Sequence, residues 1–382
     1  MRNFTVARIW GIPIRINVSL LVFLPVLAWL IGSGGQISAY EGFIEGLTGV
    51  GFDPGVLEAG SNPWIIGVAA GVGLFVSVLL HELGHSWVAL RYGLSIESIT
   101  LWILGGLAAL SEIPREWDRE FRIAIAGPIT SVLVAGASYA ALFATPSSLP
   151  VVRFVFGWLA ITNVALAVFN MLPAFPMDGG RILRALLARN RPYLSATRIA
   201  ARIGVVFAVL FAVVGVLAFD VIMLLLAFFI YGAATTESRS VMMDELLDGL
   251  AVRDVMSGDQ EPISAGSSVA DLTGRMFRDR RTVYPVSDGG TVVGVVTLGD
   301  LRSVAEGDRE STTVGSVARE VPRVDANADA FEALASFDRS REGHALVEEH
   351  GSVVGVLTRE DYGRVLALRR EVGPAVLTRH AQ

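Results

Sequence analysis

Residues 63–91, PWIIGVAAGVGLFVSVLLHELGHSWVALR, form a long apolar stretch that carries two histidines and a glutamate near its end. If this stretch is a helix, His81 and His85 lie one turn apart on the same face, so both imidazoles can reach one metal ion. Glu82 then projects beside them as a general base for hydrolysis. The stretch therefore predicts a hydrolytic metal site on an apolar helix.

A pair of capping or core histidines is the simpler alternative, because H-E-x-x-H is short and occurs by chance on ordinary helices. Ionisable side chains are costly in a bilayer, however, and usually mark a functional site there. The chain has five histidines, and the other three lie in its polar C-terminal region: His344, His350 and His380. The apolar half therefore has no histidines outside this motif.

Charge divides the 382-residue chain into two parts. Residues 1–236 hold 12 Asp/Glu and 14 Arg, a net charge of +2, whereas residues 237–382 hold 25 Asp/Glu and 17 Arg, a net charge of −8. This shift predicts a membrane-embedded domain followed by a soluble acidic one. The predicted order is a membrane domain at 1–236, a linker at 237–250, a soluble domain at 251–372 and a tail at 373–382.

The chain has no cysteine, which excludes disulfides and thiolate metal ligands. All 31 basic residues are arginines. An acidic, lysine-free soluble part is typical of a cell with a salty interior, although a GC-rich genome also removes lysine codons. No basic patch indicates nucleic-acid binding.

Apolar stretches predict about six membrane spans: 17–32, 63–91, 123–144, 151–172, 199–218 and 221–235. The intervening segments are predicted to be a hairpin or interfacial element at 4–15, a loop at 34–62, a buried β-hairpin or re-entrant sheet at 92–112 and a charged turn at 115–122. An open sheet edge cannot face lipid, so the hairpin at 92–112 is expected to be buried against protein.

The arginines predict the orientation of these spans in the cell membrane. They precede the first span, follow the second and lie between the fourth and fifth, whereas the opposite loops carry almost none. Both termini are therefore expected in the cytosol. The end of the H-E-x-x-H helix and the segment NMLPAFPMDGGR (170–181) then meet at the same depth.

Asp178 is the expected third metal ligand, because a catalytic zinc site usually takes three protein ligands. It lies at a helix break beside two glycines that allow close backbone approach. A plain Asp-Gly turn is the alternative for this segment. Glu97 and Glu112 are weaker candidates that flank the hairpin at 92–112.

These motifs together resemble the site-2 protease family of intramembrane zinc metalloproteases. The resemblance covers residues 1–236 and rests on HELGH in an apolar segment, the Gly-Gly hairpin, Ala126-Gly127-Pro128 and the Asn170 to Arg181 segment. It implies that His81, His85 and Asp178 bind Zn²⁺, that Glu82 is the base and that Asn170 positions the substrate or the oxyanion. It also implies that the hairpin at 95–110 pairs with an unwound substrate.

The soluble part contains one pattern twice, at 251–305 and 313–368. Each copy predicts strand, helix, strand, turn, strand and helix, with Gly-containing hairpins at 288–290 and 349–351. This resembles a tandem pair of CBS motifs, which implies an adenine nucleotide or a homodimer contact. Thr297 and Thr358 would then face phosphate, and Asp300 and Asp361 the ribose. The alternative is that each T-x-x-D simply caps the helix that follows it.

The sequence therefore predicts a polytopic α-helical membrane protein with a short β element, followed by an α/β CBS pair. We expect a zinc endopeptidase that cuts transmembrane protein substrates and is modulated by the CBS pair. A CBS-gated transporter or channel is the rival, but it would spread polar residues along several spans, whereas here they cluster at one depth. A catalytically silent relative is disfavoured by the complete set of His81, Glu82, His85 and Asp178.

Overall fold

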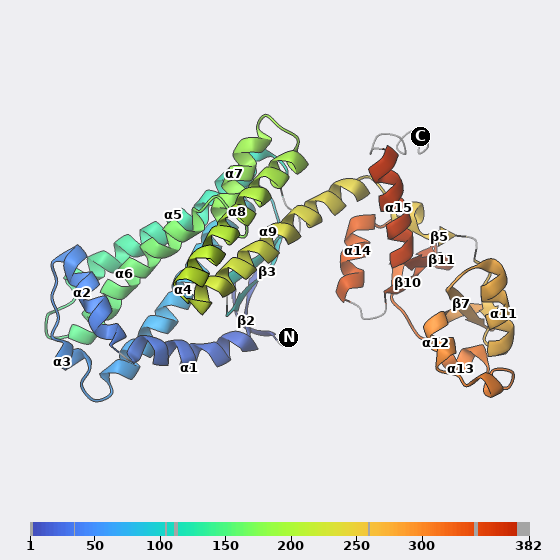
Figure 1. Cartoon of the computed structure of the whole chain (residues 1–382), viewed down its shortest axis with the longest axis horizontal. Coiled ribbons are helices and arrows are strands. Elements are labelled where there is room, and N and C mark those ends of the chain that lie inside the picture. The colour runs from blue at the N-terminus through green and yellow to red at the C-terminus, as the bar shows by residue number, and fades with distance from the viewer. Residues whose placement is uncertain are drawn as a thin grey trace. The chain divides into compact units, whose positions relative to one another are not determined.

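A computed structural model describes residues 3–33, 35–103, 105–110, 114–258, 260–339 and 343–372 (Figure 1). The chain divides into two compact units, 1–239 and 240–382. The first unit is built from long apolar helices, with a small sheet packed beside them. The second is a mixed α/β unit.

Among the described residues, five helices are long and apolar enough to cross a membrane, or six if the bent pair α1 and α2 counts as one span. Together with the fold class, this makes the protein a multi-pass membrane protein. The helices are α1 Val18–Gly32, α2 Gln36–Thr48, α3 Pro54–Leu57, α4 Asn62–Arg91, α5 Trp117–Ala144, α6 Pro150–Asn170, α7 Asp178–Ala188, α8 Tyr193–Leu217 and α9 Val221–Leu247.

Two local predictions are wrong. The expected loop at 34–62 contains helices α2 and α3, and Ile37, Ile44 and Leu57 anchor them in a cluster with Phe154 and Trp158. The expected charged turn at 115–122 instead contains the first turn of α5, where Asp118 and Glu120 suit the positive end of the helix dipole.

Glycines let α1 and α4 pack closely. A Cβ added to Gly67 would lie 2.0 Å from the carbonyl oxygen of Ala28, and one on Gly71 would lie 3.3 Å from a methyl group of Leu24. A side chain at Gly67 would therefore push the helices apart, and one at Gly71 would crowd Leu24. The small-xxx-small spacing of Gly67 and Gly71 serves this contact.

A four-stranded sheet packs against α4. Its strands are β1 Asn3–Ile9, β2 Ile12–Asn17, β3 Ile96–Trp102 and β4 Gly105–Leu110, in the order β1-β2-β3-β4. Both expected hairpins are present, and β2 joins them by parallel pairing with β3. Ile12, Ile14 and Ile99 are buried with Leu83 of α4, so the sheet covers the helix turn that carries the H-E-x-x-H motif.

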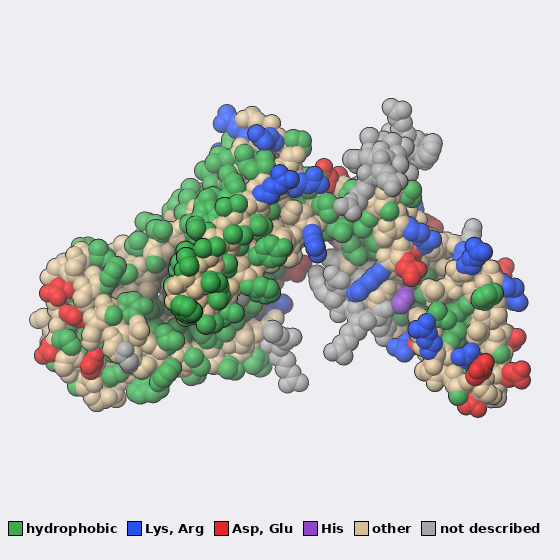
Figure 2. Space-filling model, viewed as in Figure 1, with side chains coloured by type: hydrophobic (Ala, Val, Ile, Leu, Met, Phe, Trp, Pro, Cys, Tyr) green, Lys and Arg blue, Asp and Glu red, His purple; other side chains and the backbone are tan. Residues whose placement is uncertain are grey.

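The outer surface of the first unit suits a lipid environment. Figure 2 shows hydrophobic side chains along its helices, and Leu217, Ile222 and Phe228 each expose about three quarters of their side chains. Exposed Arg189 and Arg191 lie in the turn after α7, whereas exposed Glu45 and other acidic residues belong to the α2 and α3 region. In Figure 2 blue side chains gather at the end of the unit where Figure 1 labels α7, and red ones at the end where it labels α2 and α3.

The second unit contains two similar halves. In each half a short strand pairs in parallel with the first strand of a hairpin, and two helices flank the hairpin. The sheets are β6-β7-β8 and β5-β11-β10-β9. The elements are α10 Val252–Val255, β5 Ser257–Gly258, β6 Ile263–Ser264, α11 Val269–Asp279, β7 Val283–Asp288, β8 Thr291–Thr297, α12 Leu298–Arg302, the 3-10 turn η1 Glu306–Asp308, α13 Val314–Val317, β9 Arg323–Asp325, α14 Ala330–Arg339, β10 His344–Glu349, β11 Ser352–Thr358 and α15 Arg359–Val372.

The two halves share a core. Val283 and Val295 of the first half are buried in one cluster with Leu346 and Val356 of the second. The hairpin turns fall at 289–290 and 350–351, where the repeat pattern predicts them. The predicted fold class is therefore confirmed for both parts of the chain. Helix α9 continues through the predicted linker as far as Leu247.

Candidate active site

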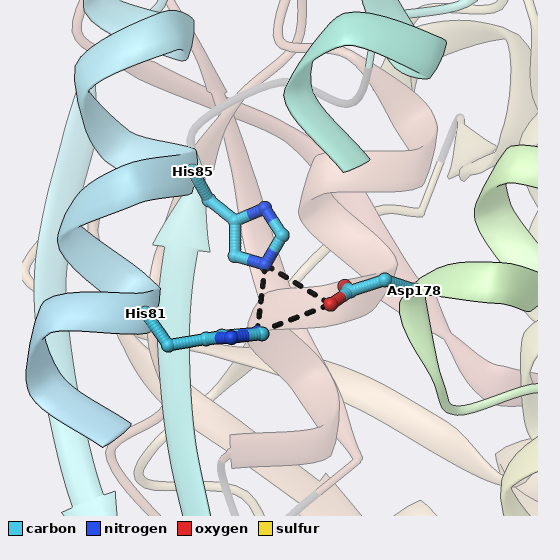
Figure 3. Close-up of side chains that lie close together, drawn as sticks. All are labelled: His81, His85 and Asp178. Carbon is cyan, nitrogen blue, oxygen red and sulfur yellow. Dashed lines mark hydrogen bonds and ion pairs between the residues drawn. The ribbon is translucent and has the colours of Figure 1, made fainter. Parts of the chain in front are cut away.

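Three buried side chains converge where α4 meets the start of α7 (Figure 3). His81 and His85 lie one turn apart on α4, and Asp178 is the first residue of α7. The Nε2 atom of His81 lies 3.1 Å from Oδ2 of Asp178 and 3.2 Å from Nε2 of His85. The Nε2 atom of His85 lies 3.2 Å from the same carboxylate oxygen. The three atoms thus form a nearly equilateral triangle.

This triangle has the size that a tetrahedral zinc ion requires. With metal–ligand bonds of 2.0–2.1 Å, two ligand atoms of a tetrahedron lie about 3.3 Å apart. Two imidazoles and one carboxylate are also a donor set that zinc accepts in catalytic sites, where one position stays open for water. The residues present therefore fit a zinc ion.

Helix α5 fixes the orientation of both imidazoles. The Nδ1 atom of His81 is 2.8 Å from Oγ of Ser131, and Nδ1 of His85 is 2.7 Å from the carbonyl oxygen of Ile123. A carbonyl only accepts, so His85 carries its proton on Nδ1 and directs the lone pair of Nε2 at the metal position. Such partners set the tautomer and the angle of metal-binding histidines.

Gly127 of α5 leaves the space that the imidazoles occupy. A Cβ at this position would lie 2.2 Å from Nε2 of His85 and 2.6 Å from Nε2 of His81. Gly84, between the two histidines, lets α4 approach α5, since its Cβ would lie 2.2 Å from Oγ1 of Thr130. The close crossing of α4 and α5 thus builds one side of the site.

The glycines after Asp178 hold the other side in place. A Cβ on Gly179 would lie 2.3 Å from the carbonyl oxygen of Leu172, and one on Gly180 would lie 2.7 Å from the backbone of Ala174. The first turn of α7 therefore packs directly on the backbone of the preceding loop. In this loop the Phe175–Pro176 peptide bond is cis. This packing brings Asp178 to the histidines, 97 residues from His81.

Glu82 lies beside strand β4. A Cβ on Gly106 would lie 2.5 Å from Cγ of Glu82 and 3.0 Å from its carboxylate, so the backbone of β4 passes directly over this side chain. Glu82 is half-buried, unlike its fully buried neighbours His81 and His85. The candidate base therefore faces the edge strand of the sheet.

The other residues predicted around the site lie outside the triangle. Asn170 is half-buried at the last position of α6, eight residues before Asp178. Glu97 is exposed on β3 and is not part of the metal-binding group. Glu112 lies outside the described residues. Of the predicted ligands, the structure brings together His81, His85 and Asp178.

A buried ion network was missed from the sequence. Arg184 of α7 donates from Nε and Nη2 to Oε1 of Glu120 on α5, at 2.7 and 2.6 Å, and from Nη1 to Oε1 of Glu237 on α9, at 2.5 Å. Its guanidinium also lies over the rings of Phe175 and Tyr193, at 5.0 and 4.9 Å from the centroids. Arg184, Glu120 and Glu237 lie on three different helices, and no spacing or motif in the sequence indicates that they form ion pairs.

The residues predicted to bind a nucleotide cap helices. Thr297 and Asp300 form a reciprocal capping box at the start of α12, in which the Asp300 carboxylate accepts from the backbone and hydroxyl of Thr297 at 2.9 and 2.7 Å. Thr358 and Asp361 make the same contacts at the start of α15. The remaining oxygen of Asp300 pairs with Arg319 at 2.5 Å. Both pairs therefore make the capping contacts that the T-x-x-D pattern predicts.

Two pockets lie in the second unit. One is lined by Thr282, Val283, Gly343, His344, Thr358, Arg359 and Glu360. It includes one of the four predicted nucleotide residues, Thr358. The other lies by Tyr284 and Arg275. Burial, together with the hydrogen bond to Asp279, raises the pKa of Tyr284 to about 12, so its phenol stays protonated at neutral pH.

Comparison with known proteins gives consistent results for both parts. The model of the protein family described as "Peptidase family M50" matches residues 69–152 and 144–211. The model described as "CBS domain" matches residues 252–307 and 314–367. A protein of Mycobacterium tuberculosis named "Putative zinc metalloprotease Rip3" is 32% identical over 96% of this chain and 93% of its own length. The zinc metalloprotease MJ0392 of Methanocaldococcus jannaschii is 30% identical over 94% of this chain and 95% of its own length. A solved site-2 protease from the same archaeon is 35% identical, with a TM-score of 0.43, over 62% of this chain and 96% of that structure.

Proposed function

The chain belongs to peptidase family M50 and carries a pair of CBS domains, and from this premise we propose that His81, His85 and Asp178 bind its zinc ion and that Glu82 is its general base. The protein is a membrane-embedded zinc metalloprotease that performs intramembrane proteolysis. The observation that carries the site assignment is the triangle of Nε2, Nε2 and Oδ2 atoms, each pair 3.1–3.2 Å apart.

The residues around the triangle have distinct roles in this proposal. A zinc ion held there supplies a Lewis acid that polarises the scissile carbonyl and activates water. Glu82 accepts a proton from the attacking water on its carboxylate and delivers it to the amide nitrogen of the leaving peptide. Ser131 and the carbonyl of Ile123 keep both imidazoles turned toward the metal position.

Metal analysis of the purified protein tests the ligand assignment. We expect one zinc ion per wild-type chain, and a loss of zinc in His85→Ala and Asp178→Ala. Glu82→Gln and the matched variant Glu97→Gln should both retain it, because neither side chain belongs to the triangle. Full zinc occupancy in Asp178→Ala would contradict the assignment of the third ligand.

We assign substrate recognition to strand β4. It is an edge of the described sheet, so its outer backbone groups can pair with an extended peptide. Because β4 crosses Glu82 at Gly106, a peptide paired there would run beside the base. A helical substrate must unwind locally to present such a strand, so we propose the transmembrane segment of a membrane protein as substrate. Asn170 is proposed to position this peptide or its oxyanion.

Both termini are proposed to lie in the cytosol. Exposed arginines at the turn after α7 and exposed acidic residues at α2 and α3 support this orientation. The chain has no cysteine, so single cysteines can be labelled without background. A membrane-impermeant thiol reagent should label Ser147→Cys in intact cells and Asn190→Cys only after lysis. The reverse pattern would contradict the orientation.

An adenine nucleotide is the proposed ligand of the CBS pair. Arg359 and His344 line the pocket that includes Thr358, and the positive charge of Arg359 balances the negative charge of Glu360, the acidic residue of the lining. Titration calorimetry with ATP should show binding to the wild type and at least about tenfold weaker binding to Thr358→Ala. Unchanged affinity in this variant would remove Thr358 from the site, and no heat with the wild type would remove ATP as ligand.

The CBS pair is also proposed to mediate a homodimer, which sedimentation of the protein in detergent would detect as two chains of 40.8 kDa per particle. Particles with one chain at all concentrations would contradict this. The alternative function, a CBS-gated transporter or channel, is not favoured, because the chain belongs to a peptidase family and both relatives above are named as zinc metalloproteases.

A further inference from the structure

The ion network of Arg184, Glu120 and Glu237 lies at the join between the proposed metal site and the helix that leads to the CBS pair. Arg184 and Glu120 expose only 1% and 4% of their side chains, whereas Glu237 exposes 26%. Taking charges out of water is costly, and apolar residues of the same size would often stabilise a fold as well or better. A buried network of this kind therefore invites a role beyond stability.

Arg184 is connected to Asp178 through helix α7, which follows Asp178, and through the loop that precedes it. The two residues share the 11-residue helix α7, so a displacement of Arg184 moves Asp178 with it. The guanidinium also lies over the ring of Phe175, three residues before Asp178 in the preceding loop. Glu120 connects the same guanidinium to α5, the helix whose Ser131 orients His81. Arg184 thus sets the position of α7 relative to the histidine side of the site.

Glu237 ties Arg184 to the second unit through helix α9. Leu247 lies ten positions after Glu237 on this helix, a rise of about 15 Å. Leu247 is fully buried in a cluster with Leu250, Val252 and Val255 of the second unit. Helix α9 therefore carries both the partner of Arg184 and a core residue of the CBS pair.

Glu237 is the exchangeable member of the network. It is the most exposed of the three residues and makes a single contact with Arg184 through Nη1, whereas Glu120 receives two. If α9 moves, Arg184 can keep Glu120 and lose Glu237. Two arrangements of one guanidinium would then correspond to two positions of α9.

We propose that Arg184 is a positioning residue for Asp178 and that its contact with Glu237 couples the metal site to the CBS pair. The proposal rests on the zinc site assigned above. Coupling between two sites is reciprocal: if the CBS pair influences the metal site, then metal at the site must influence the CBS pair by the same factor. The coupling can therefore be measured from the metal side, without knowledge of the CBS ligand.

Hydrogen–deuterium exchange of the full chain in detergent, with zinc and after chelation, tests this coupling. In the wild type, chelation should speed exchange in α7 and, by at least about fivefold, in residues 243–255 at the end of α9 and the start of the CBS pair. Glu237→Gln should keep the effect in α7 and reduce the effect at 243–255 to less than about twofold. Glu237→Asp, which keeps the charge, should restore part of it.

The matched control is Glu245→Gln, two turns further along α9 at a residue without an ion pair among the described residues. It should behave as the wild type. Two results would overturn the coupling but not the zinc site. One is a change of exchange on chelation in α7 but not at 243–255 in the wild type. The other is a change at 243–255 that is as large in Glu237→Gln as in the wild type. No zinc-dependent change in α7 in any variant would instead overturn the zinc site, and the coupling with it.

Discussion

Gly127 and Ser131 show how strongly the metal site depends on a helix that carries none of its ligands. Both lie on α5, one at the Nε2 atoms and the other at Nδ1 of His81. Gly127 leaves the space that the two imidazoles occupy, and Ser131 fixes the orientation of the His81 ring. Each supports a separate prediction.

Gly127→Ala is expected to displace both imidazoles, because its Cβ would lie 2.2 and 2.6 Å from their Nε2 atoms. A misplacement of about 1 Å at a reacting group costs roughly 10²-fold in rate. We therefore expect cleavage to fall by about that factor, with reduced zinc content by metal analysis. Gly136→Ala, on the same helix with nothing within 4 Å of the added Cβ, is the control. Equal activity of the two variants would contradict this account of the site.

Ser131→Ala is expected to weaken zinc binding by about 10- to 100-fold, as is typical when a partner of a metal-binding histidine is removed. Competition with a zinc chelator of known affinity measures this change. Ser138→Ala, also at a buried position of α5, should leave the affinity unchanged. An unaltered affinity in Ser131→Ala would show that its contact with His81 does not orient the ring.

The ligands themselves could be predicted from sequence, whereas their supports could not. The spacing of His81 and His85 indicates a shared helix face, and Asp178 stands out as a carboxylate beside two glycines. Ser131 and the carbonyl of Ile123 carry no such signal, because their role depends on how α5 crosses α4. The Ala126-Gly127-Pro128 segment marked the right helix, but not the contact that makes Gly127 necessary.

At the scale of elements, the apolar helices follow from composition, and the errors arise where tertiary packing overrides local character. Residues 36–48 contain two glycines and two glutamates, which favoured a loop. Ile37 and Ile44, seven residues apart, nevertheless face the same cluster and hold α2 as a helix. Such stabilisation comes from Phe154 and Trp158 of α6, more than 100 residues away, and is not visible in the local sequence.

Gly106→Ala tests the placement of β4 over the base. Its Cβ would lie 2.5 Å from Cγ of Glu82, so the carboxylate must shift while the triangle of ligands stays intact. We expect cleavage to fall by about 10²-fold with unchanged zinc content. Gly42→Ala in α2, where the added Cβ meets nothing, is the control. Full activity in Gly106→Ala would separate β4 from catalysis.

At the scale of the whole molecule, the division into an apolar and an acidic part follows directly from charge, and the repeat in the second part follows from its own pattern. The T-x-x-D pattern of each repeat also predicts a helix cap, and Thr297 and Thr358 make these capping contacts. The ion pair of Arg184 with Glu237 could not be predicted, because the two residues are 53 positions apart and meet only when α7 and α9 pack together.

Cleavage of a membrane-spanning substrate in liposomes tests the central claim most directly. Wild type, Glu82→Gln and chelator-treated wild type are compared on the same substrate, with bound zinc measured in parallel. We expect cleavage only by untreated wild type, with Glu82→Gln reduced by about 10²- to 10⁴-fold while it retains its zinc. Cleavage that survives both the substitution and the chelator would contradict a zinc endopeptidase built on His81, Glu82, His85 and Asp178.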